Sequence, residues 1–501
     1  MANPKKIIVS SKYNLHAKYG KKISVVDKLL INLVAADKKR NLDTQVIYID
    51  DAESANKAGI TAVASVTRES AKKAVDELYN KTQPAYVVLF GAQDIFPFQE
   101  IKNPAKDDDD VVLSDLPYAC NTPFNTKISA FTGPTRVVGR IPDIPVQPDI
   151  NYLKTVIKTI ISYKPVKTEK LMKYFSVTAA VWEKSTQQSL NSIFGNSLKL
   201  KISPPAVTGY PVADIKPLTH FYNCHGAPID SKYYGQSGNN YPTAIDSPDL
   251  NGKVSSGTVV AAECCYGAQL YNPKDADNNQ LSIANTYFKN QAIGFMGSST
   301  IAYGPADSQG LADLINQYFI KNILAGASSG RAMLEAQQKF LSVSGPHLDP
   351  YELKTLAQFY LLGDPSLVPV IEESTDSGTE TVENRRINLF NKGLNLAATI
   401  APAELIVTSK KRVKENYREE LNKIFIESDF TGNESELLYM VKSKSNKSAA
   451  FAKSITGSED VTFRTFTKES KRIKEKFNVS DVLIIKESGY QLLGWRVYHV
   501  K

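Results

Sequence analysis

The N-terminal part of the chain alternates between short apolar runs and amphipathic segments. Residues 5–11 (KKIIVSS) and 44–50 (TQVIYID) are rich in β-branched residues, which favour strands. Between them, apolar residues recur with the period of a helix at Ile23, Val26, Leu30, Leu33 and Val34. Residues 67–81 and 85–93 repeat the order of helix and then strand. This alternation predicts a parallel sheet with helices on both faces.

The segment from Asn103 to Pro134 breaks this rhythm. It contains an acidic run, Asp107 to Asp110, and several turn residues, so we expect a long surface excursion with a solvated acidic loop. A strand is expected again at residues 135–143, followed by an amphipathic helix at residues 150–164.

A second set of alternating elements follows, and its strands are the most continuously apolar in the chain. Such strands are typical of a sheet that is covered on both faces. The expected strands and helices are residues 173–181, 186–195, 219–226, 258–265, 291–299, 311–324 and 356–370.

The chain changes character after this block. Residues 371–383 (IEESTDSGTETVE) are polar and acidic, which is typical of a linker, whereas the remainder mixes a charged helix with strands. We therefore predict an α/β fold with two subdomains at 1–166 and 167–371. A linker at 372–384 and a small α+β domain at 385–501 follow them.

Composition excludes several classes of protein. The chain has 501 residues, 42% of them hydrophobic, and its apolar stretches are too short to span a membrane. Its net charge of +8 is mild for this length, so nucleic acid is not expected as a partner. Four cysteines cannot form a disulfide framework, and residues 1–18 lack the apolar core of a signal peptide. These features predict a cytoplasmic protein.

Reactive side chains follow two of the strongly apolar strands. His225 and Gly226 end the run at 219–226, and Cys264 and Cys265 end the run at 258–265. In open parallel sheets, ligands bind just outside the carboxyl ends of the strands, so these groups should meet in one crevice. An imidazole beside a thiol supports nucleophilic acyl transfer. The N–H groups of Gly226 and Cys265 would form an oxyanion hole.

Two simpler interpretations compete with catalysis. Cysteine and histidine side chains are often only packed or hydrogen-bonded in a core. Alternatively, Cys224, His225, Cys264 and Cys265 could hold zinc, but adjacent strand residues point to opposite faces and the chain lacks a CxxC spacing. We therefore expect neither a metal nor another cofactor. One cysteine of the pair should face the crevice while its neighbour packs into the core.

The paired strand ends resemble those of the caspase-like cysteine peptidases. In that group a His-Gly pair ends one strand, and an acidic residue, a small residue and a cysteine end the next, as do Glu263, Cys264 and Cys265 here. The resemblance implies that Cys265 attacks the peptide bond and that Cys264 fills the core. It also implies that His225 polarises the carbonyl and protonates the leaving amine.

The gingipain family within this group is the most similar, from about residue 5 to residue 370. The motifs that carry the similarity are AYVVLFGAQDIFPF (85–98), RVVGRIPD (136–143) and FYLLGDPSLVP (359–369). The resemblance implies a caspase-like sandwich of two subdomains, with the catalytic dyad in the second. In gingipains the loop matching Tyr303 gives an aromatic wall to the primary pocket, and the region of Trp182 and Glu183 carries an acid.

These features predict a cysteine endopeptidase that acts on a protein substrate through Cys265 and His225. The C-terminal domain would select substrates, restrain the active site or bind a regulatory partner, and no membrane partner is expected. The alternative is a scaffold or binding protein that keeps the caspase-like fold without turnover.

Overall fold

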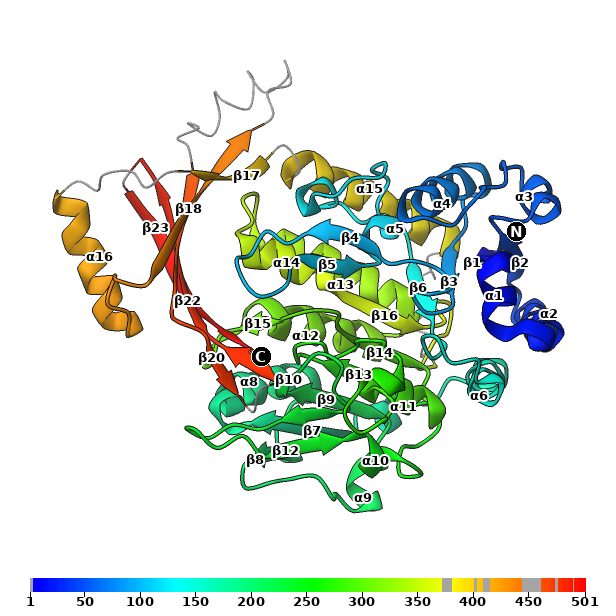
Figure 1. Ribbon diagram of the computed structural model, residues 1–501, viewed down its shortest axis with the longest axis horizontal. Helices are drawn as coiled ribbons and strands as arrows, with labels where there is room; N and C mark the ends of the chain where they lie inside the picture. The colour runs from blue at the N-terminus through cyan, green and yellow to red at the C-terminus, as the bar shows by residue number, and fades with distance from the viewer. Residues whose placement is uncertain are drawn as a thin grey trace.

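The computed structural model describes residues 3–371, 381–400, 403–408, 415–443, 461–473, 476–489 and 491–501. A ten-stranded sheet forms the centre of its larger part (Figure 1). Its strands pair in parallel, except that β14 and β16 are antiparallel to each other. The order is β2 (Asp43–Tyr48), β1 (Lys5–Ser10), β3 (Tyr86–Phe90), β6 (Val138–Ile141), β16 (Phe359–Gly363), β14 (Gly294–Ser298), β13 (Val259–Ala262), β9 (Thr219–Asn223), β7 (Tyr174–Ala179) and β8 (Leu200–Ser203). The predicted α/β class is confirmed.

The apolar runs in the sequence are strands that are buried on both faces. In β1, Ile7 and Val9 join one apolar cluster while Ile8 joins another, so successive side chains pack against opposite layers of helices. The four residues of β13 are completely buried. Continuous apolar character is therefore required of both strands.

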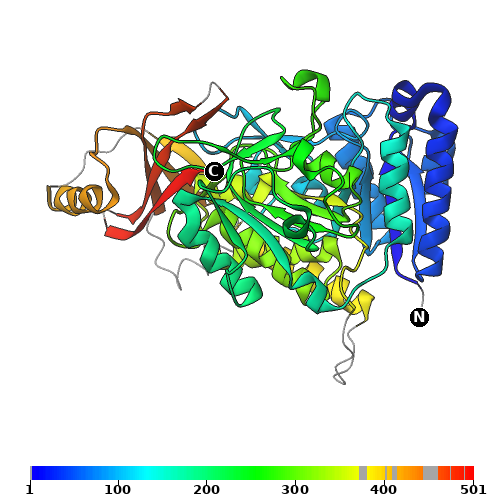
Figure 2. The same cartoon turned by 90° about the horizontal axis from the view of Figure 1, so that it is seen from below.

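Helices cover the sheet on both sides (Figures 1 and 2). The helix α6 packs against α2 and α11, while α12 packs against α8 and α13. The longer helices are α1 (Lys12–Tyr19), α2 (Ile23–Lys39), α4 (Arg68–Thr82), α6 (Ile150–Ser162), α8 (Glu183–Phe194), α11 (Ile283–Lys289), α12 (Leu311–Leu324), α13 (Ser329–Ser344), α14 (Pro350–Gln358), α15 (Val382–Ile400) and α16 (Glu415–Ser428). Short helices are α3 (Ala52–Lys57), α5 (Leu116–Ala119), α7 (Thr168–Leu171), α9 (Val212–Ile215) and α10 (Ser247–Leu250).

The strand β16 joins the two halves of the sheet. It comes from the end of the second predicted block, yet it pairs in parallel with β6 of the first block and antiparallel with β14. The Gly-Asp-Pro-Ser turn after it fixes this position, because the buried Asp364 carboxylate pairs with the buried Lys6 ammonium of β1. Burial alone would raise the pKa of Asp364, but Lys6 holds it below its ordinary value.

The expectation of a surface excursion at residues 103–134 holds only in part, since residues 123–127 are exposed but other parts of the segment are buried. The strands β4 (Gln99–Lys102) and β5 (Val111–Ser114) form a hairpin, and residues 114–120 are buried. Asp107 and Asp109 are also largely buried, because their carboxylates pair with the buried Lys354 ammonium, Asp109 at 2.7 Å. Half of the acidic run is therefore packed, with Asp107 and Asp109 sharing one lysine, while Asp108 and Asp110 are exposed.

The C-terminal residues form a second, antiparallel sheet, so an additional α+β region is confirmed. This sheet has the order β15 (Tyr303–Gly304), β23 (Gln491–Val500), β22 (Asp481–Ser488), β19 (Val461–Thr467), β18 (Ser435–Ser443) and β17 (Ala403–Thr408). Its first strand, β15, belongs to the larger part of the chain. In Figure 1, β23 extends from the C-terminal sheet to the centre of the molecule, where the C-terminus lies close to β15.

Three small hairpins or sheets complete the described structure. One of them is β10 (His225–Gly226), β11 (Lys232–Tyr234) and β12 (Thr243–Asp246), and another pairs β20 (Lys471–Ile473) with β21 (Phe477–Val479). The predicted linker lies mostly outside the described residues, and α15 begins at Val382. None of the helices in the described ranges has both the length and the apolar character that crossing a membrane requires.

Candidate active site

The two strand ends singled out in the sequence lie side by side. The strands β9 and β13 are parallel neighbours, with Ala262 in register with Tyr222. Just beyond them, Gly226 lies so close to Cys265 that a Cβ atom on Gly226 would overlap the carbonyl oxygen of Cys265. Glycine is therefore required sterically at residue 226, since any side chain would separate the two strand ends.

The turn after Cys265 holds a strained residue. Tyr266 has a φ of 53°, which non-glycine residues adopt rarely. Its N–H donates to the Thr300 carbonyl at 3.0 Å, and its hydroxyl donates to the Asp109 carboxylate at 2.8 Å. Asp109 also accepts from the N–H of Ile301. The buried acidic run thus fixes both the turn after Cys265 and the loop facing it.

The thiol of Cys265 lies against this loop. Its sulfur accepts from the N–H of Ala302 at 3.1 Å, and burial raises the pKa of the Cys265 thiol to about 12. Cys264 is also buried, and the pKa of its thiol is raised well above the ordinary value by burial and by the neighbouring Cys224. The two adjacent cysteines therefore face different surroundings.

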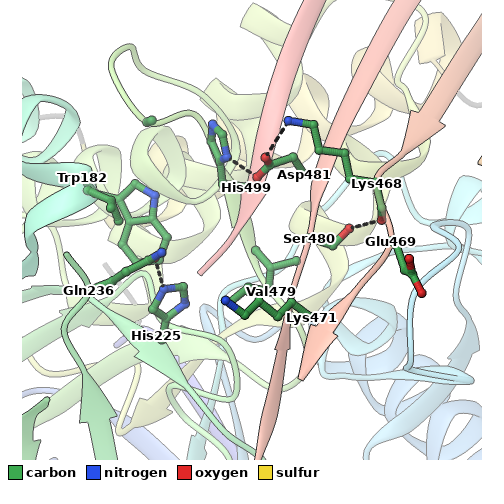
Figure 3. Close-up of a pocket in the computed structure, with 13 residues that line it drawn as sticks. Trp182, His225, Gln236, Lys468, Glu469, Lys471, Val479, Ser480, Asp481 and His499 are labelled. Atoms are coloured by element: carbon green, nitrogen blue, oxygen red, sulfur yellow. Dashed lines mark hydrogen bonds and ion pairs between the residues drawn. The ribbon is translucent and has the colours of Figure 1, made fainter. Parts of the chain in front are cut away.

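The imidazole of His225 is buried among aromatic rings. Its Nε2–H donates to the side-chain oxygen of Gln236 at 2.7 Å, which leaves Nδ1 as the acceptor nitrogen, and Nδ1 is buried without a partner in the described structure (Figure 3). The rings of Trp182 and Phe477 lie 4.4 Å and 5.3 Å from it. Burial lowers the pKa of His225 to about 4. No hydrogen bond joins this imidazole to the Cys265 thiol within the described ranges.

The crevice at these strand ends contains the end of the chain's own strand β23. Val500 pairs with Tyr303, and His499 pairs with Gly304, in antiparallel register. The N–H of Lys501 donates to the carbonyl of Ala302 at 2.9 Å. The carbonyl oxygen of Lys501 accepts from the N–H of Cys265 at 3.1 Å. An extended peptide is thus bound across the crevice with a carbonyl group at the cysteine.

The side chain of Lys501 fills a closed pocket. Its ammonium donates to Asn223 at 2.9 Å, to Glu263 at 2.9 Å and to Asp313 at 2.7 Å. All of these side chains are inaccessible to solvent, and the ring of Trp182 lies 5.4 Å from the ammonium. Burial alone would lower the pKa of Lys501, but the two carboxylates outweigh burial and raise it.

The surroundings of the two acids of this pocket favour a proton shared between them. Burial, and then the nearby Asp313 carboxylate, raise the pKa of Glu263 well above its ordinary value. Its Oε1 and the Oδ2 of Asp313 receive no hydrogen bond from any other described residue, and a protonated Glu263 satisfies both oxygens by donating to Asp313. The pair then carries one negative charge, which matches the single ammonium.

The predicted pocket residues occupy different places. Trp182 lies beside both Lys501 and His225. Glu183 accepts from Gln187 on the first turns of α8 and is not among the partners of Lys501. The backbone of Tyr303 pairs with β23, while its hydroxyl donates to Asp107 at 2.9 Å.

Sequence reasoning missed three residues of the site. Asn223 ends β9, and Gln236 lies just after β11. Asp313 lies on the first turn of α12, far along the chain from both strand ends. Only Asn223 had a sequence signal, since it precedes Cys224 and His225 at the end of an apolar run.

A pocket of about 480 Å³ opens beside the imidazole, between the larger sheet and the C-terminal domain (Figure 3). His499 and Asp481 lie on its C-terminal side, with 2.6 Å between the histidine Nδ1 and the carboxylate. Its lining includes Trp182, His225, Gln236, Lys468, Asp481 and His499.

Comparison with known proteins places this site in a peptidase family. Residues 217–370 match the family described as Peptidase family C25, and no curated protein matches the chain. The matched residues include both strand ends, the acids Glu263 and Asp313, and the Gly-Asp-Pro-Ser turn. The resemblance predicted from the sequence is confirmed over residues 217–370, which match the gingipain family of caspase-like cysteine peptidases.

Proposed function

We propose that the protein is a cysteine endopeptidase that cleaves after lysine, with Cys265 as nucleophile and His225 as proton donor. The observation that supports this most directly is the position of Lys501. Its carbonyl oxygen accepts from the N–H of Cys265 while its side chain fills the acidic pocket. A substrate residue whose peptide bond is to be cleaved has to make the same two contacts.

The chemistry assigned to each group follows from these contacts. The sulfur of Cys265 attacks the carbonyl carbon, and the N–H of Cys265 stabilises the oxyanion that forms. The N–H of Gly226 is the second proposed donor, because its backbone lies against that of Cys265. The free Nδ1 of His225 takes the proton of the Cys265 thiol and passes it to the leaving amine, while Gln236 holds the other nitrogen.

The pocket favours lysine over arginine. An ammonium has three N–H donors, and the pocket offers three acceptors, one each from Asn223, Glu263 and Asp313. A guanidinium is larger and planar and has five donors, so several of its N–H groups would be buried without acceptors. Gly304 also lies against the lysine stem, where a Cβ atom would overlap Cε of Lys501.

Location and partners remain proposals. We propose a cytoplasmic protein with a protein substrate, on the basis of its low cysteine content, and a C-terminal domain that regulates the site. The rival function is a scaffold without turnover, which the buried thiol and the filled crevice favour.

Fluorogenic peptides that differ only in having lysine or arginine before the scissile bond test the proposal. We expect the intact chain or its Lys501→Ala variant to cleave the lysine peptide preferentially. Cys265→Ala should abolish cleavage, whereas Cys120→Ala, which changes a buried cysteine outside the site, should not. A Cys265→Ala protein that still cleaves would refute the assignment of the nucleophile. No cleavage by either the intact chain or Lys501→Ala would favour the scaffold.

A further inference from the structure

The end of β23 lies in the active-site crevice as a cleaved substrate would. We infer that residues 499–501 are a substrate of the chain's own active site and that, once cleaved, they remain bound as a tethered inhibitor. On this inference, the peptidase hydrolyses the peptide bond after Lys501 in cis whenever further residues follow. The inference rests on the proposed peptidase function and adds a self-cleavage activity and a mode of regulation.

The backbone contacts give the geometry of a bound peptide over three successive residues. His499 and Val500 pair with β15, and Lys501 uses both its N–H and its carbonyl, the first to Ala302 and the second to Cys265. Addition of a strand to a sheet edge is a common way to bind an extended peptide, because main-chain hydrogen bonds hold it regardless of sequence. The Lys501 side chain then supplies the specificity.

A buried charge makes this fit selective. Lys501 directly follows β23, and its ammonium is completely buried between the Glu263 and Asp313 carboxyl groups. Burying an ammonium is costly unless it is paired and hydrogen-bonded, so a pocket of this kind would not be filled by chance packing. The pocket and Lys501 therefore complement each other in charge and in hydrogen bonding.

A second contact from the C-terminal domain covers the histidine. Phe477 of β21 stacks on the His225 imidazole at 5.3 Å with an interplanar angle of 26°, and it also packs against Tyr234 and Tyr241. The hairpin that carries Phe477 is fixed by an ion pair of 3.1 Å between Lys476 and Asp230. Thus β23 fills the crevice and Phe477 shields the imidazole at the same time.

The remainder of β23 is anchored outside the crevice. Tyr498 is completely buried, and His499 contacts the Asp481 carboxylate at 2.6 Å. Pairing with β22 along most of its length holds β23 in the C-terminal sheet. A segment tethered in this way has a high effective concentration at the site, so cleavage in cis should precede cleavage of another molecule.

The self-cleavage step is an ordinary acyl transfer. The thiol proton of Cys265 passes to Nδ1 of His225 as the sulfur bonds to the carbonyl carbon of Lys501, and the bond to the following nitrogen breaks as that amine takes the proton from His225. Water then hydrolyses the thioester, which regenerates the thiol and leaves a carboxylate on Lys501. That carboxylate end can stay in the crevice, because the strand behind it remains paired.

A chain with a short epitope peptide fused after Lys501 tests the cleavage. We expect the peptide to be lost at a rate that does not change on dilution, and mass spectrometry should find a new C-terminus at Lys501. Cys265→Ala and Lys501→Ala should each retain the peptide, whereas Lys486→Ala on the neighbouring β22 should lose it like the parent chain.

Each result has a distinct meaning. A retained peptide on a chain that cleaves lysine peptides in trans would refute self-cleavage and leave the proposed function standing. A retained peptide together with no activity in trans, even with Lys501→Ala, would count against both. Loss that slows on dilution would show cleavage between molecules and overturn the inference of a cis substrate.

The inhibitory part has its own test in the chain that ends at Lys501. We expect Lys501→Ala to raise kcat/KM for a lysine peptide in trans by about tenfold or more, because the pocket is no longer filled from within. Phe477→Ala should raise it as well, by exposing His225 while leaving the lysine pocket unchanged. Unchanged kcat/KM in both variants would refute the tethered inhibitor.

Discussion

The shared proton between Glu263 and Asp313 predicts a strongly non-additive pair of substitutions. The variants are Glu263→Gln, Asp313→Asn and the double variant, all in a Lys501→Ala background so that the chain's own lysine does not compete. In each single variant the new amide donates to the remaining carboxylate in the way that the shared proton does now. The pocket keeps one negative charge, and a bound ammonium keeps its counter-charge.

The expected magnitudes differ widely between the single and double variants. Each single variant weakens one charge-assisted hydrogen bond to the ammonium, of 2.9 Å for Glu263 or 2.7 Å for Asp313. We therefore expect transition-state binding to weaken by about 1 kcal/mol, which lowers kcat/KM for a lysine peptide roughly fivefold. The double variant leaves a buried ammonium without a counter-charge, which costs about 3–5 kcal/mol. This corresponds to a loss of roughly 150- to 5,000-fold, well above the product of the single effects.

Steady-state kinetics with two peptides measures the effect. One peptide has lysine before the scissile bond, and the other has norleucine, which keeps the apolar stem and lacks the charge. The double variant should cleave the norleucine peptide at least as well as the single variants do. Single variants that each lose as much activity as the double would refute the shared proton, because both acids would then be needed as ions.

Three further predictions concern the surroundings of the site. Gly304→Ala should lower kcat/KM for a lysine peptide far more than for a peptide with alanine at that position, because the new Cβ enters the space of the lysine stem. Gln236→Ala should lower kcat by roughly tenfold with little change in KM. It should also move the acid limb of the pH profile to lower pH, because the hydrogen bond to Gln236 that the substitution removes raises the pKa of His225. An unchanged pH profile would contradict this role. Burial, and then Asp349, raise the pKa of Glu352 from 4.5 to about 8. Between these pH values the folded state holds a proton that the unfolded state releases, so the free energy of unfolding should fall as pH rises from 4.5 to 8. Urea unfolding of Glu352→Gln should show a weaker fall over that range, and equal slopes for the two proteins would refute the assignment.

The strand ends could be predicted from sequence because their pattern is local. Apolar runs that end in His225 and in Cys265 are strands buried on both faces, and parallel neighbours bring their ends together. The sequence also indicated a role for Gly226, whose N–H was expected in the oxyanion hole. The close approach of its backbone to Cys265 is a separate, steric requirement that only the structure shows.

The lysine pocket could not be predicted because its parts lie far apart in the chain. Asp313 lies on an amphipathic helix, where an acid in the first turn is usual and is explained by the helix dipole alone. The occupant of the pocket comes from the C-terminal domain, and no periodicity in residues 491–501 indicates that the strand leaves its own sheet to enter another crevice.

The acidic run shows a different limit. Consecutive aspartates favour solvent on average, and the structure buries Asp107 and Asp109 only because Lys354, from a helix far along the chain, supplies a counter-charge. Such a pairing depends on tertiary contacts that composition does not contain.

The central position of β16 has a consequence for the order of folding during synthesis. Until residue 363 has left the ribosome, β6 and β14 each lack a neighbour, and the buried Lys6 lacks Asp364. A nascent chain stopped before β16 therefore exposes two unpaired sheet edges and leaves Lys6 with only Asp37 of its two carboxylate partners, even though both reactive strand ends have already been made. The architecture thus delays completion of the sheet that carries the candidate site until most of the polypeptide exists.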